Sequence, residues 1–170
     1  MQGALSLKAR ALQLLALRDQ SRVEMRRKLL RHAARPAASD DGDPEDDADE
    51  RRAAEVDALL DWLEANRYLS VERFVESRVN ARQGRFGNRR IRAELAQHGV
   101  ALPAELKRTL DETELDRAAA VRERRFAEPP HDAAGRAAQA RFLAARGFSA
   151  EVVHRLMRAL TATSRGEPQQ

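Results

Sequence analysis

Clusters of arginine are the residues of this sequence whose type and spacing point most directly to chemistry. Three clusters occur along the chain: Arg26, Arg27, Lys28 and Arg31, then Arg78, Arg82, Arg85, Arg89, Arg90 and Arg92, and finally Arg122, Arg124 and Arg125. A guanidinium group pairs with carboxylates and with phosphates, often through two parallel hydrogen bonds. The clusters therefore predict a polyanionic or acidic partner, and they do not by themselves choose between DNA and protein.

The overall charge supports the same prediction. The formal net charge is +4, but eight acidic residues lie between positions 40 and 50, and without them the chain carries a net charge of +12. A body this basic favours nucleic acids or acidic protein surfaces as partners. Arginine outnumbers lysine 28 to 3, as the codon usage of a GC-rich genome would also produce. The alternative that a given arginine is only a solvated surface residue therefore stays open.

Patterns typical of catalysis or metal binding are missing from the sequence. There are no cysteines, which excludes disulfides, thiolate metal sites and cysteine nucleophiles. The histidines are scattered and lack a second ligand at the spacing of a helical metal site. The segment 84–87 resembles a phosphate-binding loop only superficially, and a turn between two helices is the favoured interpretation. We therefore expect no enzymatic activity, no cofactor and no bound metal.

The composition predicts an all-α protein. Alanine, leucine, arginine and glutamate dominate, whereas glycine (8) and proline (6) are scarce, and runs of β-branched residues are absent. No apolar run approaches the ~20 residues that span a bilayer. The N-terminus also lacks the apolar core of a signal peptide. We expect a cytoplasmic protein that does not interact with membranes.

One helical pattern recurs three times along the chain. The copies begin at Ser21, Gly87 and Gly135, and each places a leucine eight residues later. The first two copies also carry an apolar residue at the fifth position, so their fifth and ninth residues share one helix face. This recurrence predicts three tandem three-helix repeats rather than one globule. The expected boundaries are 6–69, 70–112 and 113–162, with a disordered tail at 163–170.

About nine helices are expected from the apolar spacing and from capping signals. Their approximate ranges are 6–17, 21–33, 52–66, 70–83, 87–99, 103–110, 115–126, 137–145 and 149–160. The acidic segment, about 35–51, is expected to be a disordered insert within the first repeat because it has little to bury and repels itself. Its spacing does not match a calcium-binding loop. An idle tether is preferred over a segment that shields the basic surface, and that second alternative stays open.

Several blocks of the sequence resemble the RecX family of regulatory proteins. The blocks occur in the order found in that family and cover most of the chain: Ala16–Ser21, Glu24–Leu29, Leu63–Leu69, Arg73–Val75, Gly87–Leu95 and Arg141–Phe148. The resemblance implies three tandem three-helix repeats in an elongated, curved molecule. The acidic insert and the short polar tail depart from the family pattern.

The resemblance also implies a function. It indicates a bacterial regulator that binds the RecA recombinase and usually restrains its filament on single-stranded DNA, in the context of homologous recombination, DNA repair and the SOS response. Some members of the family bind single- or double-stranded DNA weakly, and we expect a monomer. The resulting hypothesis is a binding-only protein that inhibits the ATPase and strand-exchange activities of the recombinase.

A direct DNA-binding protein is the alternative hypothesis. Pairs of helices joined by a short turn resemble helix-turn-helix units, and the arginine clusters would contact phosphates. The second helices of these pairs lack the asparagine and glutamine side chains that often read bases, apart from Asn88 and Gln97.

Overall fold

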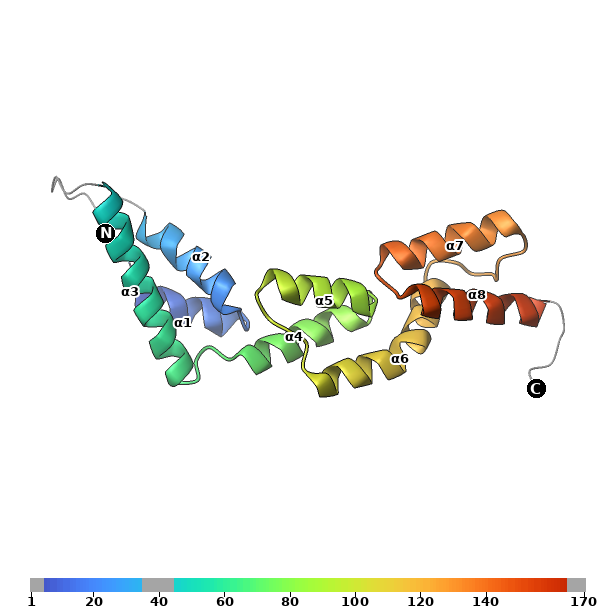
Figure 1. Cartoon of the computed structure of the whole chain (residues 1–170), viewed down its shortest axis with the longest axis horizontal. Coiled ribbons are helices and arrows are strands. Elements are labelled where there is room, and N and C mark those ends of the chain that lie inside the picture. Colours follow the sequence, from blue (N-terminus) through green and yellow to red (C-terminus); the bar gives the residue numbers. More distant parts are fainter. Residues whose placement is uncertain (1–4, 35–44, 165–170) are drawn as a thin grey trace. The chain divides into compact units, whose positions relative to one another are not determined.

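The structure is a computed structural model that describes residues 5–34 and 45–164 of the chain. Every regular element in these residues is an α-helix, which confirms the all-α prediction (Figure 1). The helices in chain order are α1 (Leu7–Leu17), α2 (Arg22–Ala33), α3 (Glu45–Ala65), α4 (Val71–Gln83), α5 (Asn88–Gln97), α6 (Ala104–Glu123), α7 (Ala133–Ala145) and α8 (Ala150–Ser164). None of them is long and apolar enough to cross a membrane.

The chain divides into two compact units, and the boundary lies inside α4. Unit 1 comprises Met1–Ser77 and unit 2 comprises Arg78–Gln170. Unit 1 therefore contains α1 to α3, and unit 2 contains α5 to α8. Each unit has an apolar core of its own.

The core of unit 1 is formed by one face of each of its three helices. Met25 and Leu29 on α2 are fully buried, as the recurring pattern predicts. They pack with α1 and with Val56, Leu60 and Leu63 on α3, whose spacing places them on one face. Burying a leucine or methionine side chain stabilises the folded state by roughly 1.5–3 kcal/mol, so this cluster holds the three helices together.

The start of α2 is fixed by a serine cap. The hydroxyl oxygen of Ser21 accepts a hydrogen bond of 3.1 Å from the amide of Glu24, which satisfies a free donor of the first turn. The Glu24 carboxylate is itself buried and receives hydrogen bonds from Arg18 and an ion pair of 3.1 Å from Lys28. The turn between α1 and α2 is thus tied together by a buried carboxylate.

The ionisation of Glu24 predicts an acid-sensitive step in the stability of unit 1. Burial would raise the pKa of Glu24, but hydrogen bonds and charges from Arg18 and Lys28 outweigh burial and lower it from 4.5 to about 2. The stabilisation is complete above pH 4.5 and is lost as the pH falls through about 2. We expect Glu24→Gln to cost about 2 kcal/mol at pH 6, since Arg18 is nearly half exposed and the pair is partly screened.

The measurement is urea unfolding followed by the fluorescence of Trp62, which is partly buried and packs against the core of unit 1. The difference between the wild-type protein and Glu24→Gln should shrink between pH 6 and pH 2. An equal difference at both pH values would show that the carboxylate charge contributes nothing.

The core of unit 2 is built on α6, and this helix corrects one prediction. Two helices were expected, at 103–110 and 115–126, whereas the structure has the single helix α6. Leu110, Glu114, Ala118 and Val121 are all buried, and their spacing places them on one continuous face. Glu114 interrupts the apolar pattern of the sequence but does not interrupt the helix.

The acidic segment and the tail also differ in part from the prediction. Helix α3 begins at Glu45, seven residues before the expected start, and α8 continues to Ser164. Asp47 lies in the first turn of α3, where a carboxylate interacts favourably with the helix dipole. Residues 35–44 and 165–170, which were expected to be disordered, lie outside the described residues.

Candidate functional site

Two turns of unit 2, one at Gly87 and one at Gly147, lie against each other and position the second arginine cluster. The amide of Gly87 donates to the carbonyl of Arg146 at 3.0 Å, and the amide of Arg89 donates to the carbonyl of Gly147 at 3.0 Å. A Cβ atom on Gly87 would lie 2.2 Å from the backbone nitrogen of Phe148, and Gly147 has a φ of +84°. Only glycine fits this backbone crossing without displacing it.

Two charged residues of α6 lie beside this crossing and satisfy its polar groups. The carboxylate of Glu114 accepts from the amides of Asn88 (2.9 Å) and Ser149 (3.3 Å), at the starts of α5 and α8. Arg117 donates to the carbonyls of Gln83 and Phe86. Burial lowers the pKa of the Arg117 guanidinium, while the charges of Glu114 and Asp111 oppose this change. The turn before α5 is therefore held by fixed hydrogen bonds.

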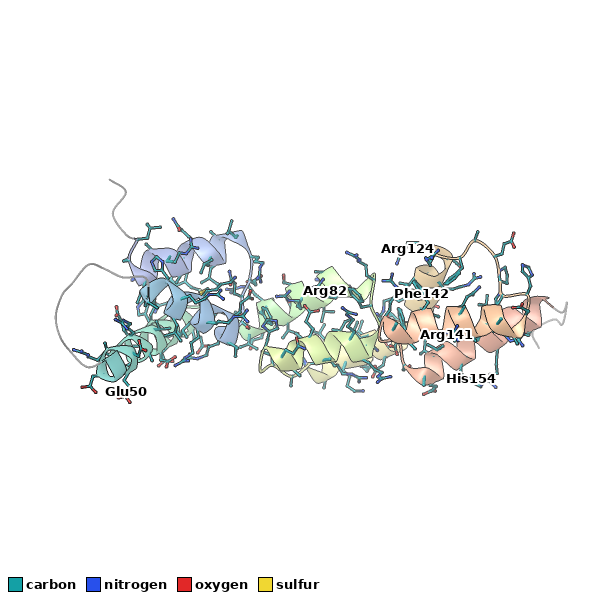
Figure 2. The ribbon with its side chains drawn as sticks, turned by 90° about the horizontal axis from the view of Figure 1, so that it is seen from above. Glu50, Arg82, Arg124, Arg141, Phe142 and His154 are labelled. Carbon is teal, nitrogen blue, oxygen red and sulfur yellow. The ribbon has the colours of Figure 1, made fainter. Side chains whose placement is uncertain are left out.

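Arginines gather around the ring of Phe86 in this turn. The guanidinium carbon of Arg90 lies 4.5 Å from the ring centroid, and those of Arg82 and Arg85 lie 5.9 Å from it, within the range of cation–π attraction. Arg124, at the end of α6, donates to the carbonyl of Gly84, which brings the third cluster to the second. We call Arg82, Arg85, Phe86, Arg90 and Arg124 the basic turn, of which Figure 2 labels Arg82 and Arg124.

The arginines of the second cluster differ in whether a carboxylate compensates them. Glu94 on α5 pairs with Arg78 at 3.3 Å and with Arg82 at 3.0 Å. Arg85 and Arg90 are exposed, and within the described residues neither pairs with a carboxylate. The uncompensated charge of the basic turn is therefore carried by exposed side chains, to which an anionic partner has access.

The first cluster, on α2 in unit 1, is divided in the same way. Arg26 forms two hydrogen bonds with Asp57 on α3, at 2.7 and 3.0 Å, and this contact lowers the pKa of the Asp57 carboxyl. Lys28 is held by Glu24 and Gln20. Arg27 and Arg31 are exposed and have no carboxylate partner in the described part of the chain, so they are the members of this cluster open to a partner.

Comparison with known proteins identifies the family. Regulatory protein RecX of Ralstonia pickettii (strain 12J) is 48% identical over 155 residues, which cover 90% of this chain and 87% of that relative. The chain belongs to the RecX family. Regulatory protein RecX of Herbaspirillum seropedicae is 46% identical over 147 residues (85% and 84%), and that of Pseudomonas putida (strain GB-1) is 36% identical over 157 residues (89% of each).

Family models match two parts of the chain. The second three-helix domain of RecX matches residues 72–102, and the third three-helix domain matches residues 112–157. The first match covers α5 and nearly all of α4, and the second covers the later half of α6 with α7 and part of α8. The resemblance drawn from the sequence is thereby confirmed, and the relatives carry the name of regulatory proteins.

One arginine of the third cluster is a structural residue in this RecX chain. Arg122 is only 4% exposed, its Nε donates to Gln139 at 2.9 Å, and its Nη2 donates to the carbonyl of Glu128. Arg122 therefore connects α6 to α7 and to the segment between them. Because its side chain is buried and hydrogen-bonded, we do not expect it to contact a partner. Its neighbours Arg124 and Arg125 are exposed, and Arg125 lies 5.5 Å from the ring centroid of Phe126.

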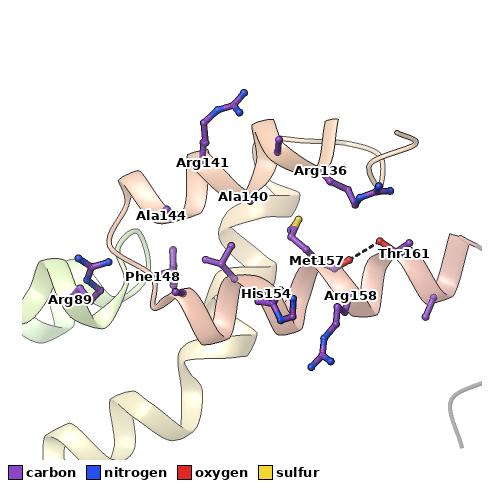
Figure 3. A pocket seen from close by; sticks show the side chains of 14 residues that line it. Arg89, Arg136, Ala140, Arg141, Ala144, Phe148, His154, Met157, Arg158 and Thr161 are labelled. Carbon is purple, nitrogen blue, oxygen red and sulfur yellow. Dashed lines mark hydrogen bonds between the residues drawn. The ribbon is translucent and has the colours of Figure 1, made fainter. Parts of the chain in front are cut away.

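A second basic surface of unit 2 was missed from the sequence. Arg136, Arg141, His154 and Arg158 border a cavity of about 900 Å³ between α7 and α8 (Figure 3). The signal that could have found it is the spacing of Ala137, Ala140 and Ala144, which places small side chains on one helix face. Among the described residues, no group of three or more His, Cys, Asp or Glu is arranged to hold a metal ion.

Proposed function

We propose that this RecX-family chain binds the filament of the RecA recombinase on single-stranded DNA and lowers its ATPase and strand-exchange activities. The observation that carries the proposal is the family membership, which covers 90% of the chain. Exposed arginines without carboxylate partners supply the chemistry, because they are free to pair with phosphates or acidic side chains. Inhibition then follows from occupancy and needs no reaction.

Two separate basic surfaces support binding to an extended partner. Unit 1 presents Arg27 and Arg31, and unit 2 presents Arg85 and Arg90. Once one surface is bound, the other binds as an intramolecular event, so two weak contacts on one chain combine into a stronger one. A filament of repeated protomers offers the repeated sites that such a chain requires. A monomer in the cytoplasm is sufficient for this function.

The alternative of direct, sequence-reading DNA binding receives less support. Of the two side chains on α5 suited to reading bases, Asn88 is only 1% exposed and is hydrogen-bonded to Asp111 at 2.8 Å and to Arg117. It cannot reach a base edge from that position. Gln97 is exposed but stands alone, whereas specific readout usually combines several such contacts.

The test is the DNA-dependent ATPase of the recombinase on single-stranded DNA with increasing amounts of the full chain. We expect a concentration-dependent loss of ATP hydrolysis, and co-sedimentation of the chain with recombinase-coated DNA at low ionic strength. A gel-shift salt series on DNA alone is the control, because phosphate contacts give steep salt dependence. Unchanged hydrolysis at saturating protein would contradict the proposal, and tight sequence-dependent binding without recombinase would favour the alternative.

A further inference from the structure

Unit 2 carries a groove between α7 and α8 that the basic turn does not use. We call it the α7–α8 groove. Its floor is formed by Ala137, Ala140 and Ala144 of α7 and by Val153 and Met157 of α8, and its volume is about 900 Å³. The floor is therefore apolar. Val153 and Met157 are buried, whereas Ala137 and Ala144 are exposed and have short side chains.

The rim of the groove is basic. Arg89 of α5, Arg136 and Arg141 of α7, and His154 and Arg158 of α8 border the floor, and none of the fourteen lining residues is acidic. In Figure 3 the side chains of Arg141 and Arg158 extend from opposite sides of the groove. None of the four arginines pairs with a carboxylate within the part of the chain that the structure describes. The groove thus combines an apolar floor with uncompensated positive charge.

The geometry of the floor favours a helix as the occupant. The three alanines are spaced i, i+3 and i+7, and the α8 residues that line the groove recur at the same helical spacing. Two helices with a shallow apolar seam accept a third, amphipathic helix through residues at i, i+3, i+4 and i+7. Short alanine side chains let the backbone of such a helix approach closely.

The same floor is poorly suited to single-stranded nucleic acid. Binding of single strands relies on exposed aromatic rings on which bases stack. Phe148 in the lining is 0% exposed, and the one exposed ring among the lining residues is the imidazole of His154 on the rim. The arginines of the rim would meet phosphates, but the floor would offer the bases nothing to stack on.

We propose that the α7–α8 groove binds an acidic amphipathic helix of a partner protein, with the apolar face of that helix on the alanine floor and its carboxylates against Arg136, Arg141 and Arg158. The identification of this partner with the recombinase rests on the proposed function. The chemistry of the groove does not rest on it.

The experiment uses the full chain and a fluorescein-labelled synthetic 18-residue peptide, with leucines on one helical face and glutamates flanking them. Fluorescence anisotropy should show the glutamate peptide binding at least tenfold more tightly than a matched peptide with lysines. Ala144→Trp fills the groove and should weaken binding at least tenfold. Ala145→Trp, at the next position, which is also exposed but does not line the groove, should leave binding unchanged, and circular dichroism of both variants verifies the fold.

The charge of the rim is tested separately with the same peptide. Arg141→Glu combined with Arg158→Glu should weaken binding at least tenfold. Arg155→Glu, on the same helix but outside the lining, should change it less than twofold. Equal effects of the two charge variants would overturn the role of the rim.

Several outcomes would overturn the groove as a site for an acidic helix. These are equal affinity of the two peptides, an unaltered affinity of Ala144→Trp, or displacement of the peptide by oligothymidine at equal charge concentration. Self-association that Ala144→Trp abolishes would show instead that a second copy of the chain occupies the groove. If the peptide binds as expected while recombinase ATPase is unaffected, the groove proposal stands and the proposed function fails.

Discussion

Replacing Gly87 with alanine is expected to destabilise unit 2 by about 3 kcal/mol or more. The new Cβ atom would lie 2.2 Å from the backbone nitrogen of Phe148 and 2.4 Å from the carbonyl carbon of Gly147. These are backbone atoms, so no side-chain rotation relieves the clash, and the two turns must separate. Their separation would break the hydrogen bonds from Gly87 and Arg89, and overpacking of this kind is among the larger effects of single substitutions.

The matched control for this variant is Gly84→Ala in the same turn. A Cβ atom on Gly84 meets nothing within 4 Å, and its φ is not in the left-handed region, so we expect a change within about 0.5 kcal/mol. Urea unfolding should be followed by circular dichroism and by the fluorescence of Trp62, the single tryptophan, which belongs to unit 1. For Gly87→Ala the circular dichroism transition should move to lower urea while the fluorescence transition stays. If Gly84→Ala and Gly87→Ala unfolded at the same urea concentration, the close backbone contact at Gly87 would not contribute to the stability of unit 2.

Removing the exposed charge of the basic turn is expected to reduce affinity for recombinase-coated single-stranded DNA about a hundredfold. The variant combines Arg85→Ala, Arg90→Ala and Arg124→Ala. Hydrogen bonds to charged groups contribute about 1.5–3 kcal/mol each, and the lower part of that range, reduced by solvent exposure, gives about 3 kcal/mol for the three. Arg82 is left in place because it holds Glu94.

The control removes the same charge elsewhere, through Arg10→Ala, Arg108→Ala and Arg155→Ala, three exposed arginines outside the basic turn. It should lower affinity less than fivefold, and both triple variants should keep the helicity of the wild-type protein. Co-sedimentation across a salt series also distinguishes binding to DNA phosphates from binding to the carboxylates of a protein. If the basic turn contacts phosphates, its removal should lower the salt slope by about 0.7 for each lost contact. Equal losses of affinity in the two triple variants would show that Arg85, Arg90 and Arg124 contribute only nonspecific positive charge.

Much of the fold was predictable because its core follows local helical spacing. The recurring pattern selected Met25, Leu29, Ile91, Leu95 and Leu143, and all five are at most 1% exposed. The weaker third copy has Gln139 where the others are apolar. That glutamine is buried because Arg122, seventeen residues earlier, hydrogen-bonds to it. Local periodicity gives no indication of such a partner.

The candidate site was less predictable because it depends on contacts between distant segments. Arg122 and Arg124 are two residues apart and identical in type, yet the first is buried and the second exposed. The difference comes from Gln139 and Glu128, which lie on later parts of the chain. The burial of Glu114 was not predictable for the same reason, since its partners Asn88 and Ser149 lie 26 and 35 residues away in the sequence. The alanines of the groove resemble ordinary helix formers in the sequence.

Because α6 is one continuous helix, it fixes the direction in which the side chains of its later half point relative to those of its first half. Each residue of an α-helix turns the chain by about 100°, so one residue inserted between Leu110 and Glu114 would turn Glu114 away from the starts of α5 and α8. An exposed loop tolerates an insertion of similar length, because its backbone can absorb the extra residue without rotating the flanking helices. We therefore expect natural variation in chain length within this family to spare the middle of α6 and to accumulate in the connections between helices.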